Sequence, residues 1–348
     1  MVAWNCKCLC KGVIADAMKS EAEKRLFEQA TQGAIELGER VGIALNGAKF
    51  VPLLMRSAEH RAAVVLRLHR KGAEDLIYKQ VFAPFDTAAF QQGVEAHKRA
   101  LERLIKAKGV GVPKILAVDN VTQSVLMQRV SGKTLNDHML QSYANPRKRH
   151  ELLTRSAAWL AAFHQPDSVK KSTFYPGFMM DHLQAQIDKI ENGDKSVPHA
   201  DRLKAAHKVL LDRIDQFLGG ETVTVAAHGD MHTRNLLISP DMVSGIDFNF
   251  THNAPIGHDI SRLLIDYATR FAQDQSLESE NIIPANDMDA FFAGYGAQYR
   301  NDASVRFLLH QQILLEWLAI PAKEDSRSYF QSHRLDGVLR LTNHVFGV

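Results

Sequence analysis

Three side chains that carry oxygen atoms lie within a short stretch of the sequence and could serve phosphoryl transfer. Asp230 and Asn235 belong to one segment, His228–Asn235 (HGDMHTRN), and Asp247 follows about twelve residues later. Carboxylate and amide oxygens suit a hard cation such as Mg²⁺, and a remaining carboxylate can accept a proton from a hydroxyl group. Phosphoryl transfer requires in-line positioning and neutralised phosphate charge more than covalent help. The stretch therefore predicts metal-assisted phosphoryl transfer.

A β-hairpin between these residues would bring them together. Two short apolar runs, Leu236–Ile238 and Val243–Ile246, are separated by a Ser-Pro-Asp turn. Antiparallel pairing of the runs would return the chain to the place where it started. We therefore expect Asp230, Asn235 and Asp247 to converge.

The spacing also resembles a known arrangement, the catalytic loop and metal-binding Asp of protein kinases. The segment His228–Asn235 followed by Ile246-Asp247-Phe248 resembles the signature of the aminoglycoside phosphotransferase and choline kinase superfamily, whose members phosphorylate small molecules. The order of elements from Phe50 to His344 is similar as well. The resemblance implies a catalytic base at Asp230 and two Mg²⁺ ligands, Asn235 and Asp247. It further implies ATP or GTP as the donor and a hydroxyl group of an amino sugar, sugar or amino alcohol as the acceptor.

Further nucleotide contacts are implied upstream. Lys79 resembles the strand lysine that holds the α and β phosphates, and Glu95 resembles the helix glutamate that pairs with it. A lysine in a cleft needs a counter-charge when phosphate is absent. Backbone groups of Gln128–Val130 are expected to meet the adenine edge. The expected phosphate loop, Arg56–Arg61, lacks the glycines of protein kinases, and Ser57 is its candidate phosphate contact.

Downstream, Gly257-His258-Asp259 resembles the family's motif in which an Asp braces the catalytic loop from the start of a helix. A carboxylate is favoured at a helix N-terminus in any case. The alternative is that Asp259 is only an N-cap.

The elements around these residues predict an α+β fold with two lobes, and the resemblance implies that this fold is protein-kinase-like. The first lobe, residues 1–130, would bind the nucleotide and would hold extra helices within 18–45, an antiparallel sheet and one helix over Thr87–Lys108. The second lobe, residues 131–348, would be mainly helical and would carry the catalytic and acceptor-binding residues. The strands expected in the first lobe are Phe50–Met55, Ala62–His69, Leu76–Phe82, Ile115–Val118 and Val125–Val130.

Composition excludes several other classes of protein. With 348 residues, 45% hydrophobic and 23% charged, the chain is long enough for two folded cores. The net charge of +3 is small, so nucleic acid is not the expected partner. No apolar run approaches the roughly 20 residues that span a bilayer, and no secretory signal is evident, so we expect a cytoplasmic protein. Nothing in the sequence indicates an oligomeric state.

The N-terminal residues raise two separate points. The three cysteines, Cys6, Cys8 and Cys10, are too few and too closely spaced for a typical tetrahedral zinc site, and they provide no disulfide framework. Because the amphipathic pattern begins only near Glu21, Met18 is a candidate for the biological start.

Two other functions stay open at this point. His228, Asp230 and His232 could belong to a metal-dependent hydrolase. The chain could also be a non-catalytic, kinase-like binding module.

The sequence gives conflicting indications of the acceptor. Five carboxylates could receive a cationic amine: Asp266, Asp289, Glu316, Glu324 and Asp325. Trp317 could add its ring face, although a core position for Trp317 is the simpler interpretation. Several arginines favour an anionic acceptor instead: Arg262, Arg270, Arg327 and Arg334.

Overall fold

The computed structural model describes residues 20–249, 252–272, 276–278 and 281–348. Met18 and the three cysteines lie outside this part of the chain. Within it, no helix combines the length and apolar character needed to cross a membrane.

The chain divides into two compact units. One runs to Lys98 and includes Pro113–Val130, and the other comprises Arg99–Val112 and Ser131–Val348. The helix α3 (Thr87–Leu104) contributes residues to both units.

The first unit is built on a five-stranded antiparallel sheet with the strand order β1-β2-β3-β6-β5. Apolar residues alternate along the strands, so that Leu66 and Leu68 of β2 and Tyr78 of β3 are buried on one face. The strands are β1 (Lys49–Ala58), β2 (Arg61–His69), β3 (Leu76–Ala83), β5 (Ile115–Asp119) and β6 (Ser124–Gln128).

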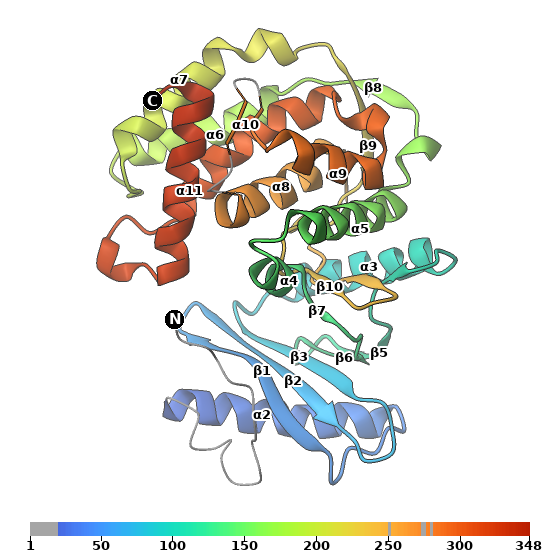
Figure 1. The fold of residues 1–348 in the computed structure, drawn as a ribbon. Helices are drawn as coiled ribbons and strands as arrows, with labels where there is room; N and C mark the ends of the chain where they lie inside the picture. The colour runs from blue at the N-terminus through green and yellow to red at the C-terminus, as the bar shows by residue number, and fades with distance from the viewer. Residues whose placement is uncertain (1–19, 250–251, 273–275, 279–280) are drawn as a thin grey trace. The chain divides into compact units, whose positions relative to one another are not determined.

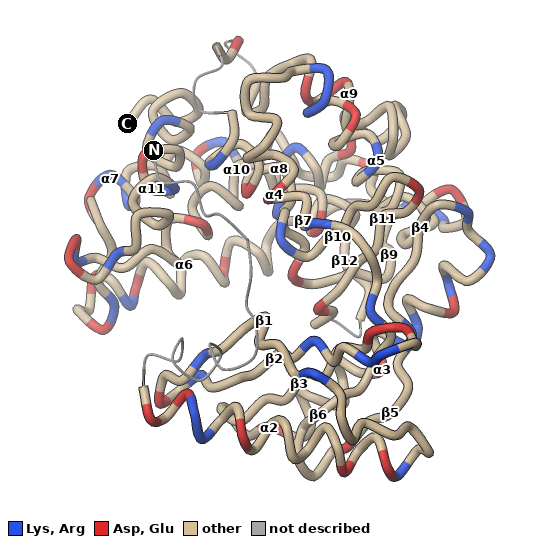
Figure 2. Tube along the Cα trace, turned by 60° about the horizontal axis from the view of Figure 1, so that its bottom comes forward, with Lys and Arg blue, Asp and Glu red and all other residues tan. Residues whose placement is uncertain are grey.

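The helix α2 (Glu21–Arg40) covers the buried face of this sheet (Figure 1). Ser20 caps it by accepting a hydrogen bond from the Glu23 N–H at 3.2 Å. Small residues bring the helix close to the strands: a Cβ atom on Gly33 would lie 2.5 Å from the Tyr78 hydroxyl. Acidic and basic residues follow one another along α2, as expected for a solvated outer face (Figure 2).

The second unit is mainly helical (Figure 1). Helices α8 and α10 pack together, and α10 is buried on almost every side, as a helix of this apolar content should be. The helices are α4 (Leu135–Gln141), α5 (Pro146–His164), α6 (Gly177–Glu191), α7 (Ala200–Asp212), α8 (Gly257–Phe271), α9 (Ala285–Tyr295), α10 (Ala303–Leu318) and α11 (Tyr329–Phe346).

Two small sheets interrupt these helices. One has the order β4-β11-β10-β7 and the other the order β12-β9-β8. Their strands are β4 (Val110–Gly111), β7 (Lys133–Thr134), β8 (Lys171–Thr173), β9 (Glu221–Ala226), β10 (Leu236–Ile238), β11 (Val243–Gly245) and β12 (Asn253–Pro255). An antiparallel sheet followed by a helical unit confirms the predicted fold class.

Candidate active site

The predicted hairpin is present. Strands β10 and β11 pair antiparallel, with Leu236 opposite Gly245. The Ile246 N–H donates to the Asn235 carbonyl at 3.0 Å and so extends the pairing by one step toward Asp247. At the turn, the Ser239 N–H donates to the carbonyl of Met242 at 2.9 Å.

Gly245 lets this hairpin approach a large core side chain. A Cβ atom at this position would lie 2.1 Å from the ring of Trp159. The indole is held in place by a hydrogen bond of 2.8 Å from its Nε1 to the Gly111 carbonyl. Any larger residue at 245 would therefore displace the strand that leads to Asp247.

The backbone on both sides of Asp247 is attached to the loop that carries Asp230. The Asn249 N–H donates to the His228 carbonyl at 3.1 Å, and His228 Nε2 bonds to the Ile246 carbonyl at 2.9 Å. The buried ring of Phe248 packs on the His228 ring with their centroids 4.4 Å apart. These contacts fix where Asp247 enters the site.

Asp247 itself has an unusual backbone conformation. Its φ of 60° lies in the left-handed region, which is uncommon for residues other than glycine and is best tolerated by Asn and Asp. Its side chain is exposed while Phe248 beside it is buried. Such conformations cost free energy and are concentrated at functional sites.

The Asp230 carboxylate is oriented by an arginine that the hairpin argument did not include. Arg262 Nη2 donates to Asp230 Oδ1 at 3.0 Å, while His232 Nε2 lies 3.7 Å from Oδ2. Burial lowers the pKa of His232, so the imidazole is neutral at pH 7. One oxygen of Asp230 is thus held by a fixed cation, and the other faces a neutral ring.

Asn235 is buried, and its amide orientation is set by the same loop. Its Nδ2 donates to the Asp230 carbonyl at 2.8 Å. This contact uses the amide donor and leaves the amide oxygen to accept or to coordinate.

Asp259 braces this loop, as predicted. Its buried carboxylate accepts from the backbone N–H groups of His228 at 2.6 Å and Gly229 at 3.0 Å, and His164 Nε2 lies 3.1 Å away. Burial acts to raise the pKa of Asp259, but hydrogen bonds from His164 and His258 outweigh it and hold that pKa well below its ordinary value. The alternative of a simple N-cap is wrong, because α8 already begins at Gly257 and the carboxylate bonds to the loop.

A second buried carboxylate, Asp266, braces the other end of the loop. It accepts from the Thr233 N–H at 3.0 Å and hydroxyl at 2.5 Å, and from Arg270 Nε at 2.7 Å. Burial acts to raise its pKa, but the charges of Arg270 and Arg334 and the Thr233 hydrogen bond lower that pKa to about 2.

Sequence reasoning missed Arg262 and Asp266 as parts of this site, although a signal was present. Asp259, Arg262 and Asp266 are spaced i, i+3 and i+7, so they share one face of α8. Once Asp259 was expected to contact the loop, the same face could have predicted the other two contacts.

The Asp266 contacts predict a stability that depends on pH. The folded-state pKa of about 2 lies below the ordinary 3.8, so the stabilisation is complete above pH 3.8 and is lost as the pH falls through 2. Asp266→Asn should therefore lower the free energy of unfolding by about 2 kcal/mol at pH 7, and by less at pH 3. Urea denaturation at both pH values measures this difference.

A matched control for that measurement is Asp201→Asn. Asp201 is an exposed carboxylate that pairs with Lys204 one turn away on α7, so its replacement should leave the unfolding curve unchanged at both pH values. An Asp266→Asn loss that is equally large at pH 3 and pH 7 would contradict the charge-based explanation.

On the first unit, Lys79 lies on β3, the central strand of the five-stranded sheet. Tyr78 and Gln80 are buried on the face covered by α2, so Lys79 belongs to the opposite face. The Glu95 carboxylate is exposed and accepts from Lys98 Nζ at 2.8 Å. The Lys79–Glu95 pair stays a prediction.

The turn between β1 and β2, where the phosphate loop was predicted, is shorter than expected. Ser57 pairs with Ala62 within the ladder between β1 and β2, and the turn consists only of Glu59 and His60. The predicted loop Arg56–Arg61 is therefore wrong, because backbone pairing continues through residues that have no strong strand propensity. Ser57 is exposed at the end of a strand.

Two backbone N–H groups of the segment Gln128–Val130 are already engaged in hydrogen bonds within the first unit. The Gln128 N–H donates to the Lys114 carbonyl at 2.9 Å, and the Arg129 N–H donates to the Asp75 carbonyl at 3.2 Å. An adenine contact through a backbone N–H of this segment therefore remains a prediction for Val130 alone.

The groups considered for acceptor binding are mostly engaged within the protein. Trp317 is core: it is fully buried, and its Nε1 donates to the Pro198 carbonyl at 2.8 Å. Arg327 bonds to the carbonyls of Pro321 and Ala322. Three of the five carboxylates considered for a cationic amine are paired with an arginine: Asp266 with Arg270, Asp289 with Arg300, and Glu316 with Arg334. The other two, Glu324 and Asp325, lie in the short helix Glu324–Ser326, and their role stays a prediction.

The position of His228 does not support the hydrolase alternative. His228 is fully buried, with Nε2 bonded to the Ile246 carbonyl and Nδ1 accepting from the Asp230 N–H at 3.3 Å, so neither nitrogen can bind a metal. Across the described residues, no three His, Cys, Asp or Glu side chains are arranged to hold a metal ion.

Comparison with known proteins decides the family. The model of the phosphotransferase enzyme family matches residues 56–308, which is more than half of the chain. The chain belongs to this family. The predicted resemblance to aminoglycoside phosphotransferases and choline kinases is thereby confirmed, whereas no curated protein matched the sequence.

Solved structures similar to this phosphotransferase include several small-molecule kinases. A choline/ethanolamine kinase family protein from Mesorhizobium loti has a TM-score of 0.55 and 14% identity, with 92% of this chain and 94% of that chain covered. A putative fructosamine-3-kinase from Thermobifida fusca has a TM-score of 0.51 and 18% identity, with coverage of 91% and 99%. An amicoumacin kinase in complex with AMP-PNP, Ca²⁺ and Ami has a TM-score of 0.52 and 14% identity, with coverage of 95% and 96%. At these identities the likeness establishes the fold.

Proposed function

We propose that this phosphotransferase moves the γ-phosphoryl group of Mg²⁺-bound ATP, or of GTP, onto a hydroxyl group of a small molecule in the cytoplasm. The observation that carries the proposal is the backbone pairing that attaches Asp247 to the loop bearing Asp230 and Asn235. Three similar structures are of kinases that act on small molecules by name, and one of them holds a nucleotide analogue and a divalent cation.

The donor set fits a hard divalent cation. Asn235 presents an amide oxygen, because its Nδ2 is already used by the Asp230 carbonyl, and Asp247 presents an exposed carboxylate. Oxygen ligands of this kind are those that Mg²⁺ prefers, together with phosphate oxygens and water. When bound, the cation would neutralise charge on the phosphates during transfer.

Asp230 is proposed as the general base. Arg262 holds one of its oxygens at 3.0 Å, so the other oxygen has a defined direction in which to accept the proton of the acceptor hydroxyl. Asp259 and Asp266 keep the loop backbone in place from the same helix face. Arg262, Asp259 and Asp266 are therefore positioning residues rather than catalytic ones.

On the first unit, Lys79 is proposed to hold the α and β phosphates, with Glu95 as its counter-charge and Ser57 as a weaker phosphate contact. Val130 and the carbonyl of Gln128 are proposed to meet the adenine edge. The acceptor class proposed is amino sugar, sugar or amino alcohol, as the names of the similar kinases suggest.

A screen of acceptors tests the proposal. Purified protein is incubated with Mg·ATP and a panel of amino sugars, monosaccharides and amino alcohols, and ADP release is measured. We expect at least one acceptor to stimulate ADP release severalfold, and chelation of the divalent metal to abolish that stimulation. A non-catalytic binding module without the proposed metal and nucleotide site would show no acceptor-stimulated ADP release and no metal-dependent nucleotide binding. That result would contradict the proposal.

A further inference from the structure

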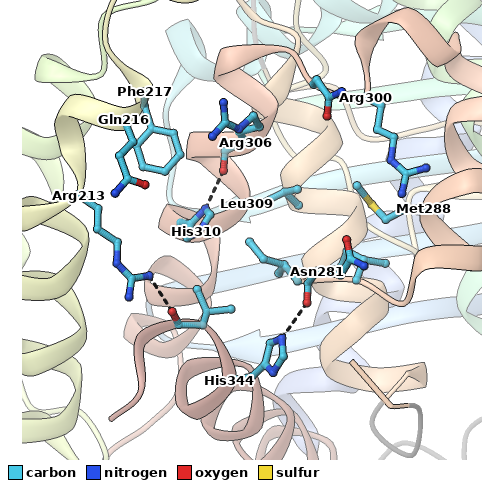
Figure 3. Close-up of a pocket in the computed structure, with 14 residues that line it drawn as sticks. Arg213, Gln216, Phe217, Asn281, Met288, Arg300, Arg306, Leu309, His310 and His344 are labelled. Carbon is cyan, nitrogen blue, oxygen red and sulfur yellow. Dashed lines mark hydrogen bonds between the residues drawn. The ribbon is translucent and has the colours of Figure 1, made fainter. Parts of the chain in front are cut away.

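The helical unit contains a cavity of about 640 Å³ whose lining is strongly cationic (Figure 3). Arginines reach it from three places in the chain: Arg213 follows α7, Arg300 follows the short helix at 297–299, and Arg306 lies on α10. His310 and His344 also line it. Its volume is in the range of sites that bind small molecules.

Among the described residues, no carboxylate forms an ion pair with Arg213 or Arg306. None of the described residues that line the cavity is an Asp or Glu. Arg300 pairs with Asp289, which lies outside the lining. Arg213 donates to the Val345 carbonyl at 2.9 Å, and Arg306 lies 5.7 Å from the centre of the Phe217 ring, so neither guanidinium is neutralised by these contacts.

The surroundings of His310 show the same excess of positive charge. Burial lowers the pKa of this imidazole, its hydrogen bond to the Arg306 carbonyl acts to raise that pKa, and the charges of Arg213 and Arg306 lower it further. Its Nδ1 bonds to the Arg306 carbonyl at 2.7 Å. A concave surface lined by one sign of charge concentrates ions of the opposite sign.

The cavity is separate from the catalytic loop. None of the described residues that line the cavity belongs to the catalytic loop, to the β10–β11 hairpin or to the residues of α8 that brace the loop.

We propose that this cavity binds a small polyanion, carrying at least two phosphate or carboxylate groups, at a site distinct from that of phosphoryl transfer. Guanidinium groups form paired hydrogen bonds with both kinds of anion, and Gln216 at the same cavity supplies a further amide group, whereas the Asn281 Nδ2 already donates to Glu278 at 2.8 Å. Arg213 and Arg306, which form no ion pair with a carboxylate in the part of the chain that the structure describes, come from different elements. An anion that bridges them would gain from both charges at once.

Calorimetric titration with two probes tests this site. Inorganic pyrophosphate and citrate are titrated separately into the full-length protein, in buffer passed over a chelating resin so that no divalent metal is present. We expect saturable binding of at least one probe, and Arg306→Gln and Arg213→Gln should each weaken it by about tenfold or more. Arg306→Lys keeps the charge and should retain most of the affinity. Preference for one probe tells phosphate from carboxylate.

Two controls locate the binding. Arg202→Gln is matched to Arg213→Gln, because Arg202 also donates to a carbonyl near the C-terminal end, that of Val348 at 2.8 Å, but does not line the cavity. It should leave the affinity unchanged, as should Lys79→Met at the proposed nucleotide site. Thermal unfolding shows whether each glutamine variant folds. If one does not, Arg300→Gln replaces it in the titration, and the rise in the Tm of the wild type on addition of the probe gives a second measure of binding. Absence of saturable binding of both probes, or loss of binding in Lys79→Met but not in the cavity variants, would overturn the proposal.

Discussion

Replacing Asp230 with Asn should lower kcat by a factor of about 10² to 10⁴ while leaving the affinity for Mg·ATP nearly unchanged. Asn has the same shape as Asp and can still accept the hydrogen bond from Arg262, so the loop should keep its conformation. It cannot take the proton of the acceptor hydroxyl. Steady-state kinetics with an acceptor found by the screen and calorimetric titration with a nucleotide analogue measure the two quantities separately.

Asp241→Asn is a suitable control for the Asp230 variant. Asp241 is an exposed carboxylate in the turn of the same hairpin, and it is not among the proposed site residues. Its replacement should leave both kcat and nucleotide affinity unchanged. A parallel loss of nucleotide affinity in Asp230→Asn would show that Asp230 acts on the nucleotide or its metal rather than on the acceptor.

Replacing Asp247 with Asn should have the opposite signature. We expect metal-dependent nucleotide affinity to fall by about 100-fold or more. Removing a residue that only hydrogen-bonds to a metal ligand already lowers metal affinity by roughly 10- to 100-fold, and loss of the ligand itself should cost at least as much. Asn is preferred to Ala for this test because position 247 has a φ of 60°, which Asn tolerates. The binding of nucleotide is measured with and without Mg²⁺.

Nucleotide binding without metal is the internal control for Asp247→Asn. It should be similar in the variant and the wild type, because Lys79 and the adenine contacts are proposed to lie on the first unit. An Asp247→Asn protein that keeps full metal-dependent affinity would contradict the assignment of Asp247 as a ligand.

The hairpin could be predicted because it depends on a local pattern, whereas the Asp259 brace was implied by the family resemblance. Two apolar runs around a Ser-Pro-Asp turn determine the pairing of β10 with β11, and the spacing of polar residues then follows. Arg262 was considered only as a possible anion contact. Its contact with Asp230 depends on how α8 is rotated against the loop, which the spacing from Asp259 could have indicated.

Other features depend on pairings that sequence patterns do not specify. Ser57 was placed in a loop because its neighbours lack strand propensity, yet cross-strand hydrogen bonds to β2 extend the strand past it. Likewise, the sequence made Glu316 a candidate acceptor contact, but in the structure it forms an ion pair with Arg334 of another helix. Ion pairs of this kind join residues far apart in the sequence, so the spacing of residues within one helix or strand does not predict them.

The location of a divalent cation is the decisive measurement. A crystal grown with Mn²⁺ and AMP-PNP should show an anomalous difference peak about 2.1 to 2.3 Å from the amide oxygen of Asn235 and from the carboxylate of Asp247. A peak coordinated by other side chains, with Asn235 and Asp247 both out of reach, would rule out the proposed metal site and the phosphoryl-transfer mechanism built on it.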